Sequence, residues 1–172
     1  MLRPPRSEPT MTLIIADHLG EEHILPELQG DTKVAVLREL CEVACRDGDV
    51  PTHEQALSAM LEREALGSTG IGDGVAIPHA KIPDLDELRI VLGLSRKGVE
   101  FDASDGAPVH LLFLIAAPVA SKNRDHLQVL ARLARMVRAP GFRDEVAELD
   151  SPAAIQHLVA RVERELFEDQ AA

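Results

Sequence analysis

The chain has 172 residues and a formal net charge of −11, from 29 acidic and 18 basic side chains. This length suits one domain with a single core. With 45% hydrophobic residues and no Trp or Tyr, that core is predicted to be aliphatic. The acidic balance argues against general nucleic-acid binding, because such a surface repels phosphates, and it favours a partner with a basic face.

The beginning of the chain has the composition of a leader rather than of a folded segment. MLRPPRSEPTM contains Arg and Pro but no apolar stretch, so it is not a secretion signal. No run in the sequence approaches the ~18–20 apolar residues of a membrane span. We therefore expect a disordered leader over 1–12 with Met11 as a candidate start, one domain over 13–168, a cytoplasmic location and no direct membrane insertion.

The first half of the domain carries two helix signals. One helical pattern runs from a cap at Asp31 or Thr32 to the DGD sequence at 47–49. A second helix is predicted to begin at Thr52, because THEQ has the spacing of a capping box. We expect this helix to end at Gly67.

Two cysteines, Cys41 and Cys45, lie one helical turn apart in the first of these helices. A redox or metal pair and a pair of buried core residues both fit this spacing. The core interpretation is favoured, because free cysteine is commonly buried.

Strand patterns occupy the middle of the chain. Segment 13–28 predicts a helical turn and an edge strand. Beyond the second helix we expect a loop over 68–74, a strand over 75–78, a loop over 79–87, a strand over 88–95, a short strand in KGVEFD after a turn at Lys97-Gly98, and a strand over 109–118. The last of these is apolar without alternation, which predicts cover on both faces.

Three helices are predicted at the end of the chain. The stretch LQVLARLARMVR is amphipathic, with one apolar side formed by Leu127, Leu130, Leu133, Ala134 and Val137. PGFRDEVAELD predicts a shorter helix, and in SPAAIQHLVARVEREL we expect Ser151 as the cap and Pro152 at the first helical position. The whole pattern predicts an α/β single domain with a mixed central sheet of about five strands sandwiched by helices.

The segment STGIGDGVAIPHAK, residues 68–81, is the strongest candidate for chemistry. Glycines let the backbone approach a ligand and point N–H groups at an anion, so Gly70, Gly72 and Gly74 are expected to support a phosphate. A neutral imidazole is a nucleophile near pH 7, and His79 is therefore a candidate phosphohistidine. The alternative from spacing alone is a histidine that anchors the loop.

Three further residues are candidates for the same site. With Asn123 as the expected cap, His126 is third in a helix, where it should be neutral and able to donate an N–H to a phosphoryl oxygen. Arg63 and Lys81 are cations near the glycine segment, and an arginine fork matches phosphoryl oxygens. A plain surface role is the alternative for each.

The remaining histidines and motifs favour no second chemistry. His110 is expected to be structural, and surface or polar-segment roles are expected for His18, His23, His53 and His157. A metal site built from His79, His126 and a carboxylate lacks the tight spacing of a zinc motif. The sequence contains neither G-x-G-x-x-G before a helix nor a P-loop, so no dinucleotide or ATP is expected.

The segment REALGSTGIGDGVAIPHAK resembles the active site of enzyme IIA of the bacterial phosphoenolpyruvate-dependent phosphotransferase system, of the mannitol/fructose type that includes nitrogen-regulatory members. GLSRKGVEFDASDGAPVHLLFLIAAP and HLQVLARLAR extend the resemblance to about 13–165. It implies phosphorylation of His79, support of the phosphoryl group by His126 and Arg63, and no cofactor or metal. The implied donor is the phosphohistidine of an HPr-type carrier.

The resemblance covers two branches with different outputs. In one, IIA passes its phosphoryl group to a IIB component for sugar uptake; in the other, its phosphorylation state controls regulated target proteins. Because no IIB or membrane portion follows the domain, we expect the nitrogen-regulatory branch. A sugar-specific IIA subunit is the alternative. A partner-binding module without phosphorylation is a further alternative, from a different class of function.

Overall fold

A computed structural model describes residues 13–46, 51–120 and 123–168. The expected leader over 1–12 and the predicted helix stop at 47–49 lie outside the described residues. In chain order the elements are α1 (Ile15–His18), the 3-10 turn η1 (Glu21–His23), β1 (Ile24–Leu25), α2 (Lys33–Ala44), α3 (His53–Ala65), β2 (Gly70–Gly72), β3 (Val75–Ala76), β4 (His79–Ile82), β5 (Arg89–Val99), β6 (Val109–Pro118), α4 (Asn123–Val137), α5 (Phe142–Ala147) and α6 (Pro152–Phe167).

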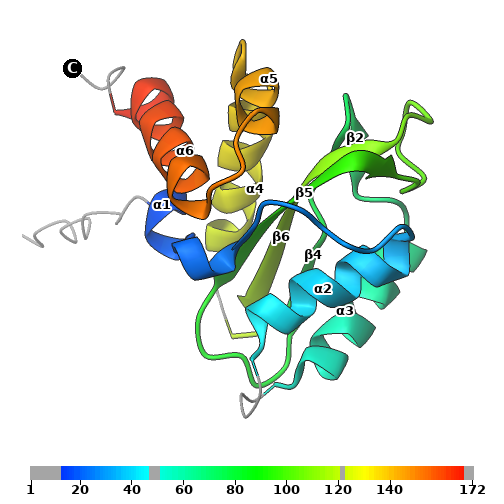
Figure 1. The fold of residues 1–172 in the computed structure, drawn as a ribbon. Coiled ribbons are helices and arrows are strands. Elements are labelled where there is room, and N and C mark those ends of the chain that lie inside the picture. The colour runs from blue at the N-terminus through cyan, green and yellow to red at the C-terminus, as the bar shows by residue number, and fades with distance from the viewer. Residues whose placement is uncertain (1–12, 47–50, 121–122, 169–172) are drawn as a thin grey trace, which may run out of the picture.

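A mixed sheet runs through the middle of the domain, with helices on both faces (Figure 1). Its order is β1-β5-β6-β3-β2, and β4 also pairs with β6. β5 and β6 are antiparallel, whereas β3 and β4 follow one another along β6 in parallel. The described residues thus form six strands rather than the expected five or so, in the predicted α/β single domain.

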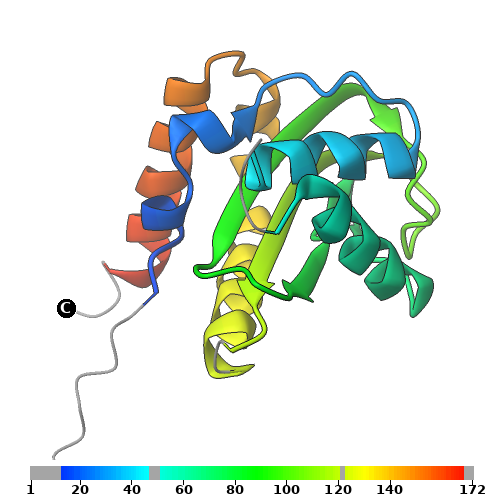
Figure 2. The ribbon, with the colours of Figure 1, turned by 90° about the horizontal axis from the view of Figure 1, so that it is seen from below.

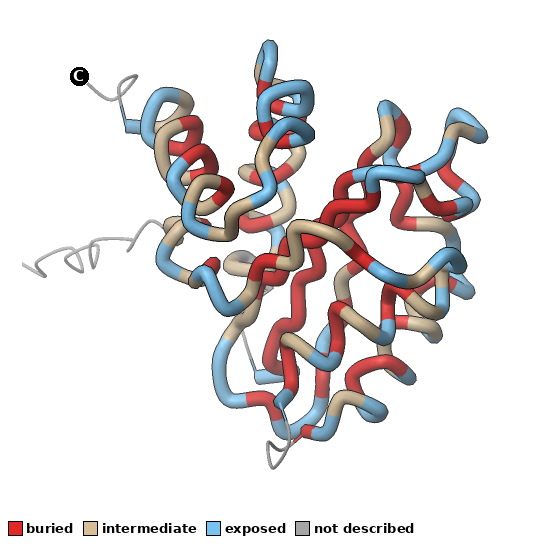
Figure 3. The backbone as a smooth tube through the Cα atoms, viewed as in Figure 1, coloured by how far each residue is buried: buried red, intermediate tan, exposed pale blue. Residues whose placement is uncertain are grey.

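The two long strands are buried on both faces, as the apolar run at 109–118 predicted. From β6, Leu112, Leu114 and Ala116 pack toward α2 and α3. The alternate residues Leu111, Phe113 and Ile115 pack toward α1, α4, α5 and α6. Figure 2 shows the two helix layers on either side of the sheet, and Figure 3 shows the buried path of the central strands between them.

The helix caps follow the sequence signals. The Thr52 side chain accepts from the Gln55 N–H while the Gln55 side chain accepts from the Thr52 N–H, so the predicted capping box is confirmed. Thr32, and not Asp31, is the cap of α2. Ser151 is the cap of α6, with Pro152 in its first turn.

Several boundaries differ from the prediction because backbone pairing overrides local signals. Gly70–Gly72 form β2, where a loop was expected, and His79 opens β4 instead of following a strand. β5 continues through Lys97-Gly98 to Val99. Its irregular pairing with β6 absorbs the expected turn as a bulge, with Gly98 at φ +81°.

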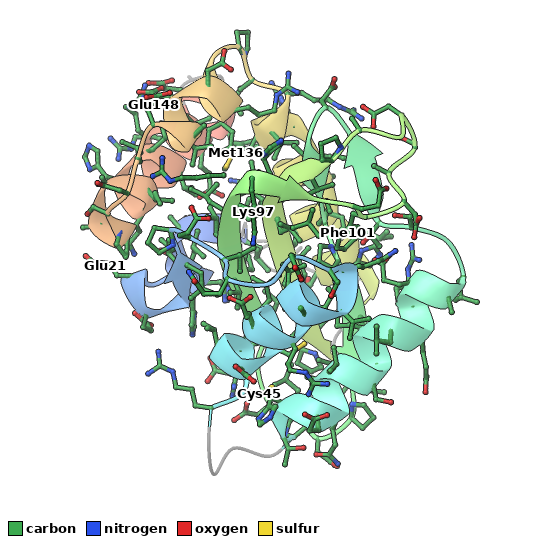
Figure 4. All side chains as sticks on the ribbon, turned by 45° about the vertical axis from the view of Figure 1, so that its right-hand side comes forward. Glu21, Cys45, Lys97, Phe101, Met136 and Glu148 are labelled. Carbon is green, nitrogen blue, oxygen red and sulfur yellow. The ribbon has the colours of Figure 1, made fainter. Side chains whose placement is uncertain are left out.

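Both cysteines lie in the hydrophobic core between α2, α3 and the sheet, and they form no disulfide. Figure 4 labels Cys45 at the end of α2. Burial raises the pKa of the Cys41 thiol to about 12, so this residue is a packed core side chain. No helix within the described ranges is long and apolar enough to cross a membrane.

Candidate active site

His79 is held in place by the strand path that leads to it. β3 and β4 both pair with β6, one after the other. Ile77 and Pro78 form the break between them, because proline has no N–H for a ladder hydrogen bond. The Pro78 carbonyl still accepts from the Ile115 N–H at 2.9 Å. His79 then pairs with Ile115 as the first residue of β4, with its side chain half-buried.

The proton on the His79 ring can be assigned from its hydrogen bond. Nδ1 lies 2.8 Å from the Ile77 carbonyl oxygen, which can only accept. Nδ1 therefore carries the hydrogen, and in the neutral ring Nε2 holds the free electron pair. The strand geometry thus selects one tautomer and makes Nε2 the nucleophilic atom.

His126 lies beside His79, although the two residues are far apart in the sequence. The two ring centroids are 5.3 Å apart and the planes meet at 83°, an edge-to-face contact. α4 begins at Asn123, so Asn123 is the first helical residue and not the expected cap, and His126 is fourth. The residue before Asn123 lies outside the described part of the chain.

Both imidazoles favour the neutral form. Burial is the main cause that lowers the pKa of His79, and the charge of Arg63 lowers it further. Burial also lowers the pKa of His126, followed by repulsion from His79 and from Lys81. Neutral rings at neutral pH leave His79 nucleophilic and leave His126 with one N–H to donate.

The two cations lie within electrostatic reach of the rings. Arg63, in the last turn of α3, donates from Nη1 to the Gly67 carbonyl at 2.9 Å, which ties it to the start of the glycine segment. Lys81 follows His79 on β4 with an exposed side chain. The structure thus gathers His79, His126, Arg63 and Lys81 at one end of β4.

The three glycines lie on the hairpin formed by β2 and β3. Gly72 lies beside Asp105, and Gly74 accepts from the N–H groups of His110 and Leu111. Val75 pairs with Leu111 and His79 with Ile115, so Gly74 lies about 13 Å or more along β6 from His79. A role in phosphate support for Gly70, Gly72 and Gly74 stays a prediction.

Glu64 is a residue of this region that sequence reasoning missed. Its buried carboxylate accepts from the Thr69 N–H and the Thr69 hydroxyl, and it pairs with Lys33 Nζ at 2.7 Å. These bonds fix the connection from α3 to β2, and the Glu64 charge acts on His79. A glutamate in an amphipathic helix is ordinarily expected to be exposed. Nothing in the sequence around Glu64 indicates that it pairs with Lys33, because Lys33 lies on a different helix, α2.

Three exposed apolar side chains lie on or just after elements that carry the site: Leu66 at the end of α3, Val119 after β6, and Leu127 next to His126 on α4. The exposed fractions are 85% for Leu66, 55% for Val119 and 64% for Leu127. Leu127 was expected on the buried side of its helix, and that expectation is wrong. The predicted burial of Leu133 and Val137 is confirmed, and Val129 and Met136 complete the buried side. Figure 4 labels Met136 on α4.

Within the described ranges, no group of three or more His, Cys, Asp or Glu side chains is arranged to hold a metal ion. The chemistry that the gathered groups can perform is nucleophilic attack by the His79 Nε2 atom on an electrophile. An anionic electrophile such as a phosphoryl group is favoured, because the charge of Arg63 acts on His79, the charge of Lys81 acts on His126, and the neutral His126 ring can donate one N–H.

Comparison with known proteins agrees with this chemistry. Residues 17–162 match the family described as phosphoenolpyruvate-dependent sugar phosphotransferase system, EIIA 2. The chain is 39% identical over 147 residues to the nitrogen regulatory protein of Bradyrhizobium diazoefficiens, covering 85% of this chain and 94% of that protein. It is 37% identical over 131 residues to the fructose-specific EIIA component of Haloferax volcanii, covering 76% and 84%.

Solved structures show the same fold. The nitrogen regulatory protein IIA-Ntr of Neisseria meningitidis superposes with a TM-score of 0.78 at 29% identity, covering 84% of this chain and 98% of that chain. Enzyme IIA for mannitol from Escherichia coli, in complex with phosphorylated enzyme IIB, gives 0.70 at 27% identity, covering 83% and 97%. This chain therefore belongs to the EIIA type 2 family of the phosphoenolpyruvate-dependent phosphotransferase system.

Proposed function

We propose that the Nε2 atom of His79 accepts a phosphoryl group from the phosphohistidine of an HPr-type carrier and then gives it up to a second protein. The observation that carries this proposal is the Nδ1 bond to the Ile77 carbonyl at 2.8 Å, because it leaves Nε2 unprotonated beside the His126 ring. The same features disfavour a partner-binding module without phosphorylation.

The transfer is an in-line displacement between two imidazoles. The Nε2 electron pair forms the new N–P bond, and the carrier's N–P bond breaks with its electron pair returning to the carrier ring. The His126 N–H and the Arg63 guanidinium stabilise the charge on the equatorial phosphoryl oxygens. Because both ends of the transfer are imidazoles, the equilibrium lies near balance, which suits a relay in which the covalent phosphohistidine is transient.

The surface around the site suits a docking protein. The exposed side chain of Leu127 offers apolar contact area next to His126, and Leu66 and Val119 are exposed at the ends of α3 and β6. The net charge of −11 favours a carrier with a basic face, chiefly through the association rate. We expect this exchange between proteins to take place in the cytoplasm.

For the output, the nitrogen-regulatory role is our first choice and sugar-specific transfer our second. The first rests on the match that spans 94% of the nitrogen regulatory protein and on the TM-score of 0.78 to IIA-Ntr. The second rests on the fructose-specific relative and on the mannitol IIA structure that holds a phosphorylated IIB partner.

One experiment separates these outputs. The chain is first loaded by a phosphorylated HPr-type carrier and then mixed with fructose- and mannitol-type IIB domains. The regulatory role predicts loading without rapid discharge to either IIB, whereas discharge within the time of carrier loading assigns the sugar role. Failure to load from any HPr-type carrier would overturn the relay itself.

A further inference from the structure

A cavity of about 350 Å³ lies near the start of β6, away from His79. It opens between residues 94–96 of β5, the turn before β3, and α5. Lys97 and Glu148, labelled in Figure 4, directly follow the lining residues of β5 and α5. Leu111 lines the cavity and Ile115 pairs with His79, so about 13 Å of β6 separates the two places.

The inner wall of this cavity is aliphatic. Its apolar lining residues are Pro26, Val75, Leu94, Leu111, Val146 and Ala147. The volume falls within the range of small-molecule sites, ~300–1,000 Å³. These walls suit a short branched hydrocarbon body and offer little to a compact inorganic ion.

The polar side of the cavity carries two guanidinium groups. Arg143 Nη1 donates to the Asp73 carbonyl at 2.9 Å and lies 3.7 Å from the Asp73 carboxylate, whose side chain is 76% exposed. Arg96 pairs with Glu27 at 3.2 Å. Such exposed ion pairs are weak, so a ligand carboxylate can replace the Asp73 carboxylate at Arg143.

One further polar side chain, that of His110, lines the same wall. His110 Nδ1 donates to the Ser95 carbonyl at 2.8 Å, which leaves Nε2 of the neutral ring as an acceptor. Ser95 is 1% exposed, so its hydroxyl does not face this open cavity, and its carbonyl is engaged by His110.

We propose that this cavity binds a small aliphatic monocarboxylate, with its carboxylate on Arg143 and its hydrocarbon body against Val75, Leu94, Leu111 and Val146. A monoanion fits better than a phosphate dianion, because Asp73 and Glu27 already offset the two arginines and the whole chain is acidic. The site is separate from the His79 chemistry and does not depend on it.

The test is a titration of the full, unphosphorylated, ¹⁵N-labelled chain with 4-methylpentanoate, followed by amide chemical shifts. We expect saturable shifts at residues 94–96, 110–111 and 146–147. Arg143→Gln should weaken binding about tenfold. Arg138→Gln is the matched control, because Arg138 is exposed, makes the same charge change and does not line the cavity.

Ala147→Phe supplies a second variant with little risk to folding, because Ala147 is exposed on α5 and its enlarged side chain occupies the cavity mouth. It should abolish the saturable shifts. The proposal is overturned if the folded wild type shows no saturable shifts at these amides, or if both arginine variants weaken binding equally. It is also overturned if 4-methylpentanamide or inorganic phosphate binds there as tightly as the acid.

Discussion

The rings of His79 and His126 meet edge to face with centroids 5.3 Å apart, one from a strand and the other from the first turn of a helix. The proposed transfer gives these two neighbouring residues different roles. His79 has its Nδ1 engaged by the Ile77 carbonyl, and in the proposed transfer it attacks with Nε2. His126 is the neighbour that can donate an N–H to the phosphoryl oxygens as charge develops there.

Replacing His126 tests that supporting role. His126→Ala should slow phosphoryl transfer to His79 by about 10²-fold, the usual cost of removing one positioned donor to a transition state. The product should still be phosphorylated on His79, because the nucleophile is unchanged. Quenched-flow loading followed by intact-mass analysis measures both points, and a rate equal to that of wild type would exclude a role for His126 in transfer.

The pH dependence follows from the lowered pKa of His79. A His pKa below its ordinary value of ~6.5 means that the ring is already neutral at pH 7. Loading should therefore be independent of the His79 charge between pH 7 and 8 and should fall once the pH drops below this lowered pKa. An NMR titration of the ring nitrogens gives the value directly, with the urea-unfolded chain as reference. A higher pKa in the folded chain than in the unfolded chain would contradict the expectation.

Glu64 should contribute to stability through its buried bonds to Thr69 and Lys33. Glu64→Gln removes the charge that pairs with Lys33 and should lower the free energy of unfolding by about 2–4 kcal/mol. Urea denaturation measures this change. Glu62→Gln is the control on the same helix: its side chain is exposed, and a change within ~0.5 kcal/mol is expected. Equal changes in the free energy of unfolding for the two variants would mean that the Glu64 bonds do not contribute to stability.

Leu127 should act in docking rather than in chemistry. Leu127→Ser removes exposed apolar surface next to His126 and should raise the KM for the phosphorylated carrier several-fold without changing kcat. Val34→Ser is the matched control, since Val34 is also exposed but lies on α2. Steady-state loading kinetics distinguish the two, and a fall in kcat for Leu127→Ser would point to a disturbed site instead.

The sequence signals that succeeded are those with a local physical cause. The Thr52 capping box and the two-sided burial of 109–118 follow from spacing alone, and the structure confirms both. The prediction of a loop at Gly70–Gly72 was wrong, because glycines carry no side-chain pattern that could indicate a strand. This strand exists only through its pairing with β3. Whether a glutamate or a leucine is buried depends on what lies opposite it in the fold, which is why Glu64 was missed and the exposure of Leu127 was wrongly predicted.

The same distinction holds for the site. His79 and His126 were singled out by their sequence context and then by the family resemblance, and the structure brings their rings together. The tautomer of His79 had no signal in the sequence, because it depends on the direction of the Ile77 carbonyl at the break between β3 and β4.

The most direct test of the account is to load the chain from a phosphorylated HPr-type carrier and locate the phosphoryl group. The account predicts one acid-labile phosphoryl group on Nε2 of His79, seen by intact mass and by phosphorus–nitrogen NMR, and its loss in a folded His79→Ala variant. Phosphorylation that persists in His79→Ala, or that falls on Nδ1, would contradict it.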